Sequence, residues 1–376
     1  MTKSLISLTA ALALALPASA QEQPNLQSSS EVVTQSSEPA PSPNQIVAEA
    51  GGSEWIAIPA EDLLVMTLAP DAEGDAREVV IQLMPAPFSQ GWVENIRTLA
   101  RAGWYDGISV NRVQDNYVVQ WGDPNYDNPE ASGEAKPLPQ SLNTVPETAY
   151  TVDGDAIALS VKLADSERDL ALEHGDALAG TDETTGIILA NGLVDSYSQA
   201  ALFGNGWPLS TNAGDAAEGE PAAVWPVHCY GMVGVGRGMS PDTGSGAELY
   251  TVIGHAPRHL DRNIALVGRI VEGMEHLSSL PRGTGDLGFY TTEEADKRTP
   301  ILSIRVASDL PEADPASSSE AVGQDTRPAF EYLSTEGETF ARYADARANR
   351  RDPFFIVPAG GADICNIPVP VRRVGG

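Results

Sequence analysis

Basic residues are scarce in this chain. Its 376 residues include 23 Lys and Arg against 52 Asp and Glu, and the formal net charge is −29 at pH 7. A protein with such an excess of negative charge repels the phosphate groups of nucleic acids and of anionic lipids. We therefore expect neither nucleic acid nor a membrane surface among its partners. The acidity does not by itself identify a ligand.

A hydrophobic run long enough to span a bilayer is also missing. The apolar stretch at residues 5–16 is shorter than the roughly 20 residues of a transmembrane helix, which argues against a membrane anchor. It follows Lys3 and leads through Pro17 to Ala18-Ser19-Ala20, an order typical of a cleaved secretory signal peptide. We expect residues 1–20 to be removed on export. The mature chain is then expected in the periplasm, without a membrane span.

Cysteine is nearly absent, with Cys229 and Cys365 as the two copies. In an oxidising compartment this pair can form a disulfide, which would tie the end of the chain to its middle. Two separate buried thiols fit the sequence equally well, because spacing along the chain does not reveal the distance between two side chains. The pairing stays open at this point.

Motifs for cofactors and metals are missing as well. The glycine-rich run 231–238 lacks the Gly-Lys-Ser/Thr ending of a phosphate loop and the strand-to-helix context of a dinucleotide site. His255, His259 and Asp261 are close in sequence, but Pro257 argues against the helix that would place the two histidines on one face. We expect no metal and no cofactor.

Residues 21–52 contain no aromatic side chain and are rich in Ser, Gln, Pro and Glu. Such a segment buries too little apolar surface to offset the entropy lost on ordering. We expect a disordered linker here, with the ordered chain beginning near Trp55.

Local patterns predict the first elements after the linker. Apolar residues at 63–68 and 79–83 flank a turn, which predicts a β-hairpin. From Ser89, a candidate N-cap, to Gly103, apolar residues recur at helical spacing and predict an amphipathic helix.

The most informative stretch is 104–123. Its apolar residues alternate on both sides of the turn pair Asp115-Asn116, which predicts two antiparallel strands. This pairing brings Arg112 and Gln120 together as a cluster of hydrogen-bond donors. No nucleophile or phosphate loop accompanies them, so chemistry at this place would depend on positioned hydrogen bonds and on shape.

Two blocks of the chain, 77–124 and 228–306, resemble the cyclophilin-type peptidyl-prolyl isomerases. The residues that carry the resemblance, in the family's order, are Tyr105-Asp106-Gly107, Arg112, Gln120, Gly122-Asp123, the run 246–250, Leu260-Asp261 and the run 267–274. The resemblance implies a mainly β fold, in which a closed eight-stranded antiparallel barrel is capped by two helices.

The resemblance also implies how the site works. Rotation about an X-Pro bond faces a barrier of about 18–20 kcal/mol, because resonance gives the C–N bond partial double-bond character. Arg112 is expected to donate to the proline nitrogen and so to stabilise the twisted state, in which that nitrogen regains its lone pair. Gln120 is expected to bind the substrate backbone and to orient the arginine.

The other substrate contacts of the family map onto nine positions: Tyr117, Val118, Gly236, Arg237, Glu248, Tyr250, His259, Leu260 and Ile264. Among them, Gly236 and Arg237 correspond to a backbone segment that pairs with an extended peptide. The apolar members would form the proline pocket, although the same side chains would serve equally well as barrel core.

The chain departs from the family pattern next to the arginine, where Asn111 replaces the usual histidine, and at four of the nine positions. These four are Glu248 for glutamine, Tyr250 for phenylalanine, His259 at a tryptophan or histidine position, and Ile264 for a histidine or aromatic. The arginine donor is retained. We expect Glu248 to pair with Arg112 and to compete with substrate, which would reduce the rate.

The remaining segments lie outside the compact family form. The cyclophilin-like domain is expected at 53–308, with an insertion at about 125–226 that contains a strand-like stretch at 156–163 and an apolar stretch at 186–193. The insertion either forms a wall beside the groove or is a solvated excursion.

A last barrel strand is expected at 301–306, followed by an extension at 309–376. In this extension Thr326 and Pro328 begin a predicted helix that reaches Arg351. The segment 354–371, with Cys365, is expected to lie extended on the surface.

Together these features predict a monomeric, exported enzyme that isomerises X-Pro bonds in proline-containing polypeptides and assists their folding. Two alternatives remain from the sequence. One is a non-catalytic proline-peptide-binding module or chaperone on the same scaffold. The other is a structural protein of the cell envelope.

Overall fold

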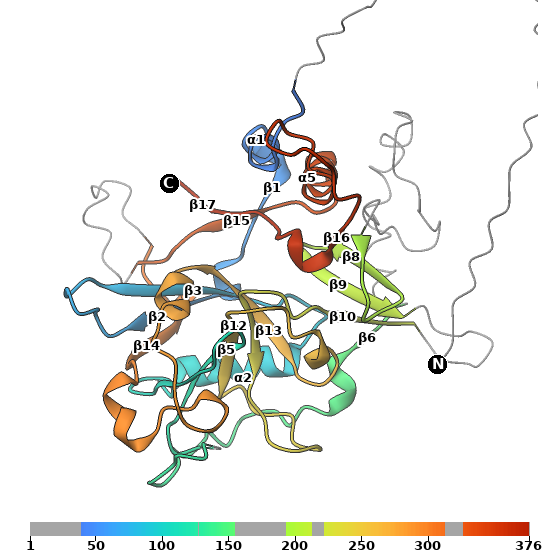
Figure 1. The fold of residues 1–376 in the computed structure, drawn as a ribbon. Helices are drawn as coiled ribbons and strands as arrows, with labels where there is room; N and C mark the ends of the chain where they lie inside the picture. Colours follow the sequence, from blue (N-terminus) through green and yellow to red (C-terminus); the bar gives the residue numbers. More distant parts are fainter. Residues whose placement is uncertain (1–38, 127, 155–192, 213–221, 313–325, 376) are drawn as a thin grey trace, which may run out of the picture. The chain divides into compact units, whose positions relative to one another are not determined.

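The computed structural model describes residues 39–126, 128–154, 193–212, 222–312 and 326–375 (Figure 1). The predicted signal peptide at 1–20 and the predicted strand at 156–163 lie outside these ranges, as does nearly all of the apolar stretch 186–193. None of the described helices combines the length and the apolarity that a bilayer crossing needs.

The centre of the fold is an eight-stranded antiparallel sheet in the order β14-β2-β3-β13-β11-β12-β5-β4. Its strands are β2 (Leu63–Leu68), β3 (Arg77–Leu83), β4 (Ser109–Val113), β5 (Val118–Gly122), β11 (Met232–Val235), β12 (Leu249–Val252), β13 (Leu266–Glu272) and β14 (Ile301–Val306). Backbone hydrogen bonds between residues 107–110 and 299–301 join the two edge strands. The predicted mainly β barrel is confirmed.

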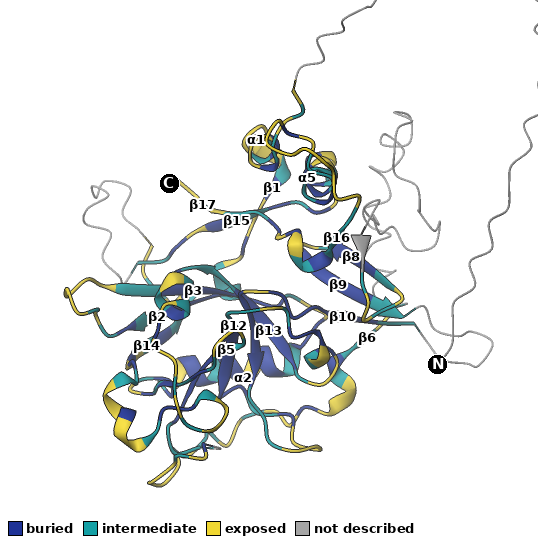
Figure 2. Cartoon of the chain, viewed as in Figure 1, coloured by how far each residue is buried: buried dark blue, intermediate teal, exposed yellow. Residues whose placement is uncertain are grey.

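The interior of the barrel is filled by apolar side chains. The ribbon of the barrel strands is largely dark blue, the colour of buried residues, in Figure 2. The hairpin predicted from the pattern at 63–68 and 79–83 is confirmed, because β2 pairs with β3 along its whole length. Strands β4 and β5 also pair, and Asn116 in their turn has a left-handed φ of 51°. The apolar runs at 63–68 and 79–83 and the alternation around the turn at 115–116 therefore located these barrel strands correctly.

Two helices pack against the barrel. Helix α2 (Gln90–Arg101) buries Trp92, Ile96 and Leu99 completely. Ser89 occupies the predicted N-cap position, but its side chain makes no capping bond and instead donates from Oγ to the carbonyl of Leu266 at 2.7 Å. Helix α4 (Glu275–Ser278) is the short second helix and buries Leu277.

The described part of the insertion forms its own four-stranded sheet in the order β6-β10-β9-β8. Its strands are β6 (Val152–Asp153), β8 (Ala200–Gly204), β9 (Trp207–Asn212) and β10 (Ala223–Pro226). The two-residue strand β7 (Leu193–Val194) precedes β8 in the chain and is not part of this sheet. Leu202, Trp207 and Leu209 are at most 3% exposed and share one hydrophobic core with the barrel. The described insertion is therefore packed against the barrel.

Segments that precede and follow the barrel in the chain together form a three-stranded sheet and a pair of helices. Strand β1 (Trp55–Ala57) pairs with β15 (Phe330–Leu333), which also pairs with β17 (Val371–Arg373). Helix α1 (Pro43–Ala48) lies beside α5 (Glu338–Ala348) in Figure 1, and the two helices are in contact.

Two of our sequence-based expectations about these segments are wrong. The disordered linker was expected to reach residue 52, yet α1 is capped by Ser42 and buries Ile46 to 2% exposure. The helix predicted from Thr326 to Arg351 is a strand at its start, since Phe330–Leu333 is hydrogen-bonded on both edges, and the helix begins only after Gly337.

The tail of the chain is attached to the middle of the sequence. Cys229 and Cys365 form a disulfide, with their Cα atoms 5.1 Å apart. Beside it, β16 (Ala362–Asp363) pairs in parallel with β7 of the insertion. The tail is thus exposed at Phe354 and Ile356, as expected for a surface segment, but buried at Ile364 and Ile367.

Candidate active site

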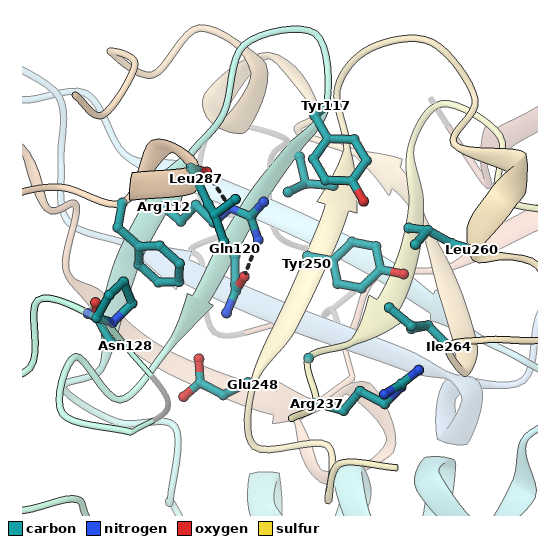
Figure 3. A pocket seen from close by; sticks show the side chains of 14 residues that line it. Arg112, Tyr117, Gln120, Asn128, Arg237, Glu248, Tyr250, Leu260, Ile264 and Leu287 are labelled. Atoms are coloured by element: carbon teal, nitrogen blue, oxygen red, sulfur yellow. Dashed lines mark hydrogen bonds between the residues drawn. The ribbon is translucent and has the colours of Figure 1, made fainter. Parts of the chain in front are cut away.

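A pocket with a volume of about 560 Å³ lies over strands β4, β5 and β12 and the loops beside them (Figure 3). Its lining consists of Arg112, Tyr117, Val118, Gln120, Asn128, Pro129, Gly236, Arg237, Glu248, Tyr250, Leu260, Ile264, Leu287 and Phe289. Ten of the eleven site residues predicted from the sequence are in this set.

Arg112 reaches the pocket because of an irregularity in β4. The register with β5 shifts between Val110 and Arg112, so Asn111 is an extra residue in the strand. Asn111 is buried, donates from Nδ2 to the carbonyl of Gly122 at 3.0 Å and accepts from Ser109 Oγ at 2.7 Å. A bulge of this kind redirects the next side chain, which here is the arginine.

Three hydrogen bonds hold the Arg112 guanidinium. Nε donates to the carbonyl of Leu287 at 2.7 Å, Nη1 donates to Gln120 Oε1 at 3.2 Å, and Nη2 donates to Gln114 Oε1. The guanidinium also lies 5.6 Å from the Tyr117 ring centroid and 5.5 Å from that of Phe289. Burial lowers the pKa of Arg112, but an arginine remains charged near neutral pH.

Gln120 lies on β5 directly opposite Arg112 and, across the other edge, opposite Tyr250 on β12. Its Oε1 accepts from Arg112, as the dashed line in Figure 3 shows. A Cβ added to Gly236 would lie 3.6 Å from Gln120 Nε2, so the amide nitrogen is directed toward the backbone of that glycine. Gln120 thus connects the arginine to the far side of the pocket.

The apolar wall of the pocket is separate from the barrel core. Val118, Tyr250 and Val252 form their own cluster, against which Tyr117, Leu260 and Ile264 pack. On β5, the strand that carries Val118, the side chains of Val119 and Trp121 belong to the barrel core. Because successive side chains of a strand point to opposite faces, β5 serves the core and the pocket at once.

Glu248 does not pair with Arg112 in the described structure, contrary to our expectation. Its Oε1 accepts the backbone N–H of Asp123 at 2.8 Å, and the residue is only 4% exposed. The carboxylate lies against Gly122, where an added Cβ would approach Oε1 to 2.0 Å. The glycine therefore makes room for the acid at the edge of the pocket.

Arg237 and Gly236 form another edge of the pocket. Arg237 donates from Nε to the carbonyl of Asn263 at 2.9 Å, and the Gly236 N–H donates to the carbonyl of Glu248 at 2.8 Å. His259 does not line the pocket. Its ring stacks on Tyr117, with centroids 6.3 Å apart, so it supports the pocket wall from outside.

Sequence reasoning missed four lining residues. Asn128 and Pro129 belong to the insertion, which therefore does form a wall beside the pocket. Leu287 and Phe289 come from the loop around η7 (Asp286–Gly288). These loops have no periodic pattern, although the Asn-Pro pair is a turn signal that marks the first of them.

The residues weighed as metal ligands have other partners. Asp261 accepts from His228 and Arg258, and His255 lies 3.2 Å from the amide of Asn116. Among the described residues, no group of three or more His, Cys, Asp or Glu side chains is arranged to hold a metal ion.

Comparisons with known proteins agree with this geometry. The family described as "Cyclophilin type peptidyl-prolyl cis-trans isomerase/CLD" matches residues 75–306, which is more than half of the chain. The cyclophilin AquaCyp293 from Hirschia baltica has a crystal structure with a TM-score of 0.56 at 20% sequence identity. This similarity covers 88% of this chain and 96% of that chain.

A second crystal structure is more distant. It is a cyclophilin-type peptidyl-prolyl cis-trans isomerase from Cryptosporidium parvum in the presence of the dipeptide Ala-Pro, with 11% identity and a TM-score of 0.32 over 65% of this chain and 97% of that chain. No curated protein sequence matches the chain. The barrel, its pocket and the family match lead to one conclusion: this chain belongs to the cyclophilin-type peptidyl-prolyl cis-trans isomerases.

Proposed function

We propose that the pocket binds proline-containing segments of exported polypeptides and that Arg112 accelerates rotation about the X-Pro bond. The observation that carries this proposal is the guanidinium held rigidly beside an apolar pocket by Leu287, Gln114 and Gln120. A fixed donor of this kind stabilises charge that develops in the transition state without the cost of reorganisation. No proton transfer is needed.

The apolar wall supports the choice of substrate. Val118, Tyr250, Leu260 and Ile264 offer a hydrophobic surface of the kind that suits a proline ring. The substrate backbone would lie along Gly236, next to the amide nitrogen of Gln120. Arg112 is then within reach of the imide nitrogen from the opposite side.

The experiment is a peptide isomerisation assay and a proline-limited refolding assay on residues 21–376. We expect Arg112→Ala to lower kcat/KM by about 10²–10³-fold, the effect of losing one preorganised donor. Arg112→Lys keeps the charge but not the planar fork, so it should recover only part of the rate. Arg342→Ala is the matched control, because Arg342 is an exposed arginine that pairs with Glu49, the C-cap residue of α1.

One observation favours the alternative that the protein binds proline-containing peptides without catalysing their isomerisation. Arg112 uses three of its donors on protein acceptors, which leaves fewer for the substrate. A wild-type chain that binds proline peptides but gives no acceleration in either assay would favour the binding module over the enzyme.

We further propose that the protein acts in the periplasm and assists slow folding of exported proteins. The signal-peptide pattern at 1–20 supports export, and the Cys229–Cys365 disulfide suits an oxidising compartment. The test is fractionation of cells that produce the full chain. A mature N-terminus at Gln21 in the periplasmic fraction is expected, and an uncleaved cytoplasmic product would contradict the proposal.

A further inference from the structure

Behind the pocket, a series of buried polar side chains begins at Tyr250. The Tyr250 hydroxyl lies 3.0 Å from His228 Nε2, and His228 Nδ1 lies 2.8 Å from Asp261 Oδ1. The side chains of His228 and Asp261 are 1% and 3% exposed. In Figure 3 the hydroxyl end of Tyr250 points toward Leu260 and Ile264, which form the same wall of the pocket.

The series continues into the insertion. Asp261 Oδ2 accepts from Arg258 Nε at 2.7 Å, and Arg258 Nη2 donates to Asp195 Oδ2 at 2.7 Å. The side chains of Arg258 and Asp195 are 2% and 1% exposed. The hydroxyls of Ser198 and Ser210 each donate to Asp195 Oδ2 at 2.6 Å. A barrel residue in the pocket is thus linked to a carboxylate of the insertion.

A carboxylate only accepts hydrogen bonds, so His228 donates from Nδ1 to Asp261. The other ring nitrogen, Nε2, lies at hydrogen-bond distance from the Tyr250 hydroxyl. These two contacts, one at each nitrogen of the imidazole, hold the Tyr250 ring in one orientation at the pocket wall.

The ion pairs of Arg258 with Asp195 and Asp261 also fix the position of a second pocket residue, Leu260. Arg258 and Leu260 both belong to η6 (Arg258–Leu260), and Leu260 lines the pocket. The bond from Arg258 to Asp195 therefore anchors this short segment to the insertion. Asp195 itself directly follows β7, which pairs with β16 of the tail.

Electrostatics support the anchoring role of Asp195. Burial alone would raise the pKa of this carboxyl, but hydrogen bonds from Arg258, Ser198 and Ser210 outweigh burial and lower the pKa to about 2. Asp195 is therefore a buried anion at neutral pH. A buried charge that loses its partner is costly, so each member constrains the position of the next.

We propose that Asp195, Arg258, Asp261 and His228 are positioning residues through which the insertion sets the geometry of Tyr250 and Leu260 in the proline pocket. The inference rests on the proposed function, because it assigns the specificity of that same pocket. None of the four contacts the reacting bond. Their effect is expected on substrate binding and only slightly on the rate of bound substrate.

The test measures the affinity of residues 21–376 for the peptide Ala-Ala-Pro-Phe by NMR titration, together with KM and kcat. We expect Asp195→Asn to raise Kd and KM by about 3–10-fold and to leave kcat within about twofold. Ser210→Ala removes one bond to Asp195 and should raise Kd by a smaller factor, so it serves if Asp195→Asn fails to fold. Asp62→Asn is the control, since Asp62 is a partly buried carboxylate away from the pocket lining and is paired with Arg97 on α2. It should lower the melting temperature without changing Kd.

A second comparison tests the link through the hydroxyl. Tyr250→Phe removes the contact to His228, so His228→Gln should raise Kd less in the Tyr250→Phe chain than in the wild type. The inference is overturned if Kd is unchanged in both Asp195→Asn and Ser210→Ala. It is also overturned if the effects of the His228 and Tyr250 changes on Kd are fully additive. Either result leaves the proposed function standing. A wild-type chain that does not bind the peptide would overturn the proposed function as well.

Discussion

Arg112 Nη1 and Gln120 Oε1 are joined by a hydrogen bond of 3.2 Å between neighbouring strands, with Gln120 directly opposite Arg112 in the register. The bulge at Asn111 separates this pair from the regular pairing of Val110 with Trp121. Arg112 therefore owes its direction to the strand and its final orientation to Gln120. The bulge in β4 and the hydrogen bond to Gln120 thus both contribute to the position of the Arg112 guanidinium.

The first prediction concerns Gln120. We expect Gln120→Ala to lower kcat/KM about 10-fold, less than the loss expected for Arg112→Ala, because Leu287 and Gln114 still hold the guanidinium. The peptide isomerisation assay measures this directly. Gln90→Ala is the control, since Gln90 only donates to backbone carbonyls near the start of α2. A loss as large as that of Arg112→Ala would mean that Gln120 takes part in the reaction itself.

The barrel and much of its site were accessible from sequence because their signals are local. Apolar runs at 63–68 and 79–83 and alternating apolar residues on both sides of the turn at 115–116 mark strands β2 to β5, and one hairpin brings Arg112 and Gln120 together. The predicted pocket residues also recur in an order that resembles a known family. His259 stacks on the Tyr117 ring and is not among the lining residues, because sequence order does not tell which side of a loop faces the cavity.

The missed elements depend on contacts between distant segments. The apolar spacing of Phe330 and Leu333 fits a helix, but β1 and β17 supply partners on both edges and make the segment a strand. Helix α1 has only six residues and depends on contact with α5. Neither partner can be recognised from the composition of the segment itself.

The second prediction concerns the disulfide. We expect the Cys229→Ser, Cys365→Ser double variant to lose about 2–5 kcal/mol of unfolding free energy, because the crosslink restricts the unfolded chain over a separation of 136 residues. Urea unfolding of the oxidised wild type and of the variant measures the difference. A reductant should destabilise the wild type and leave the variant unchanged. Equal midpoints for the two oxidised chains would show that the tail needs no crosslink.

The third prediction concerns acid stability. The pKa of Asp195 is about 2 in the folded protein, below the ordinary value of 3.8. A lowered folded-state pKa stabilises the fold at pH values above the unfolded pKa, and this contribution is lost as pH falls from about 4 toward 2. The contribution is about 2 kcal/mol for this shift.

Asp195→Asn should therefore reduce the steepness with which stability falls between pH 4 and pH 2. Urea unfolding at several pH values checks this slope. Asp75→Asn, which changes an exposed turn carboxylate, is the control and should keep the wild-type slope. The assignment to Asp195 fails if both variants follow the wild-type curve.

The last prediction concerns the contact between Gly122 and Glu248. A Cβ at position 122 would lie 2.0 Å from Glu248 Oε1, so Gly122→Ala must displace the carboxylate and break its 2.8 Å bond to the Asp123 N–H. We expect a loss of about 1–3 kcal/mol in unfolding free energy and weaker peptide binding, because Glu248 lines the pocket. Adding Glu248→Ala removes the clash and should recover part of the stability, although the Asp123 N–H then loses its acceptor. Purely additive losses in the double variant would mean that the two residues do not compete for the same space.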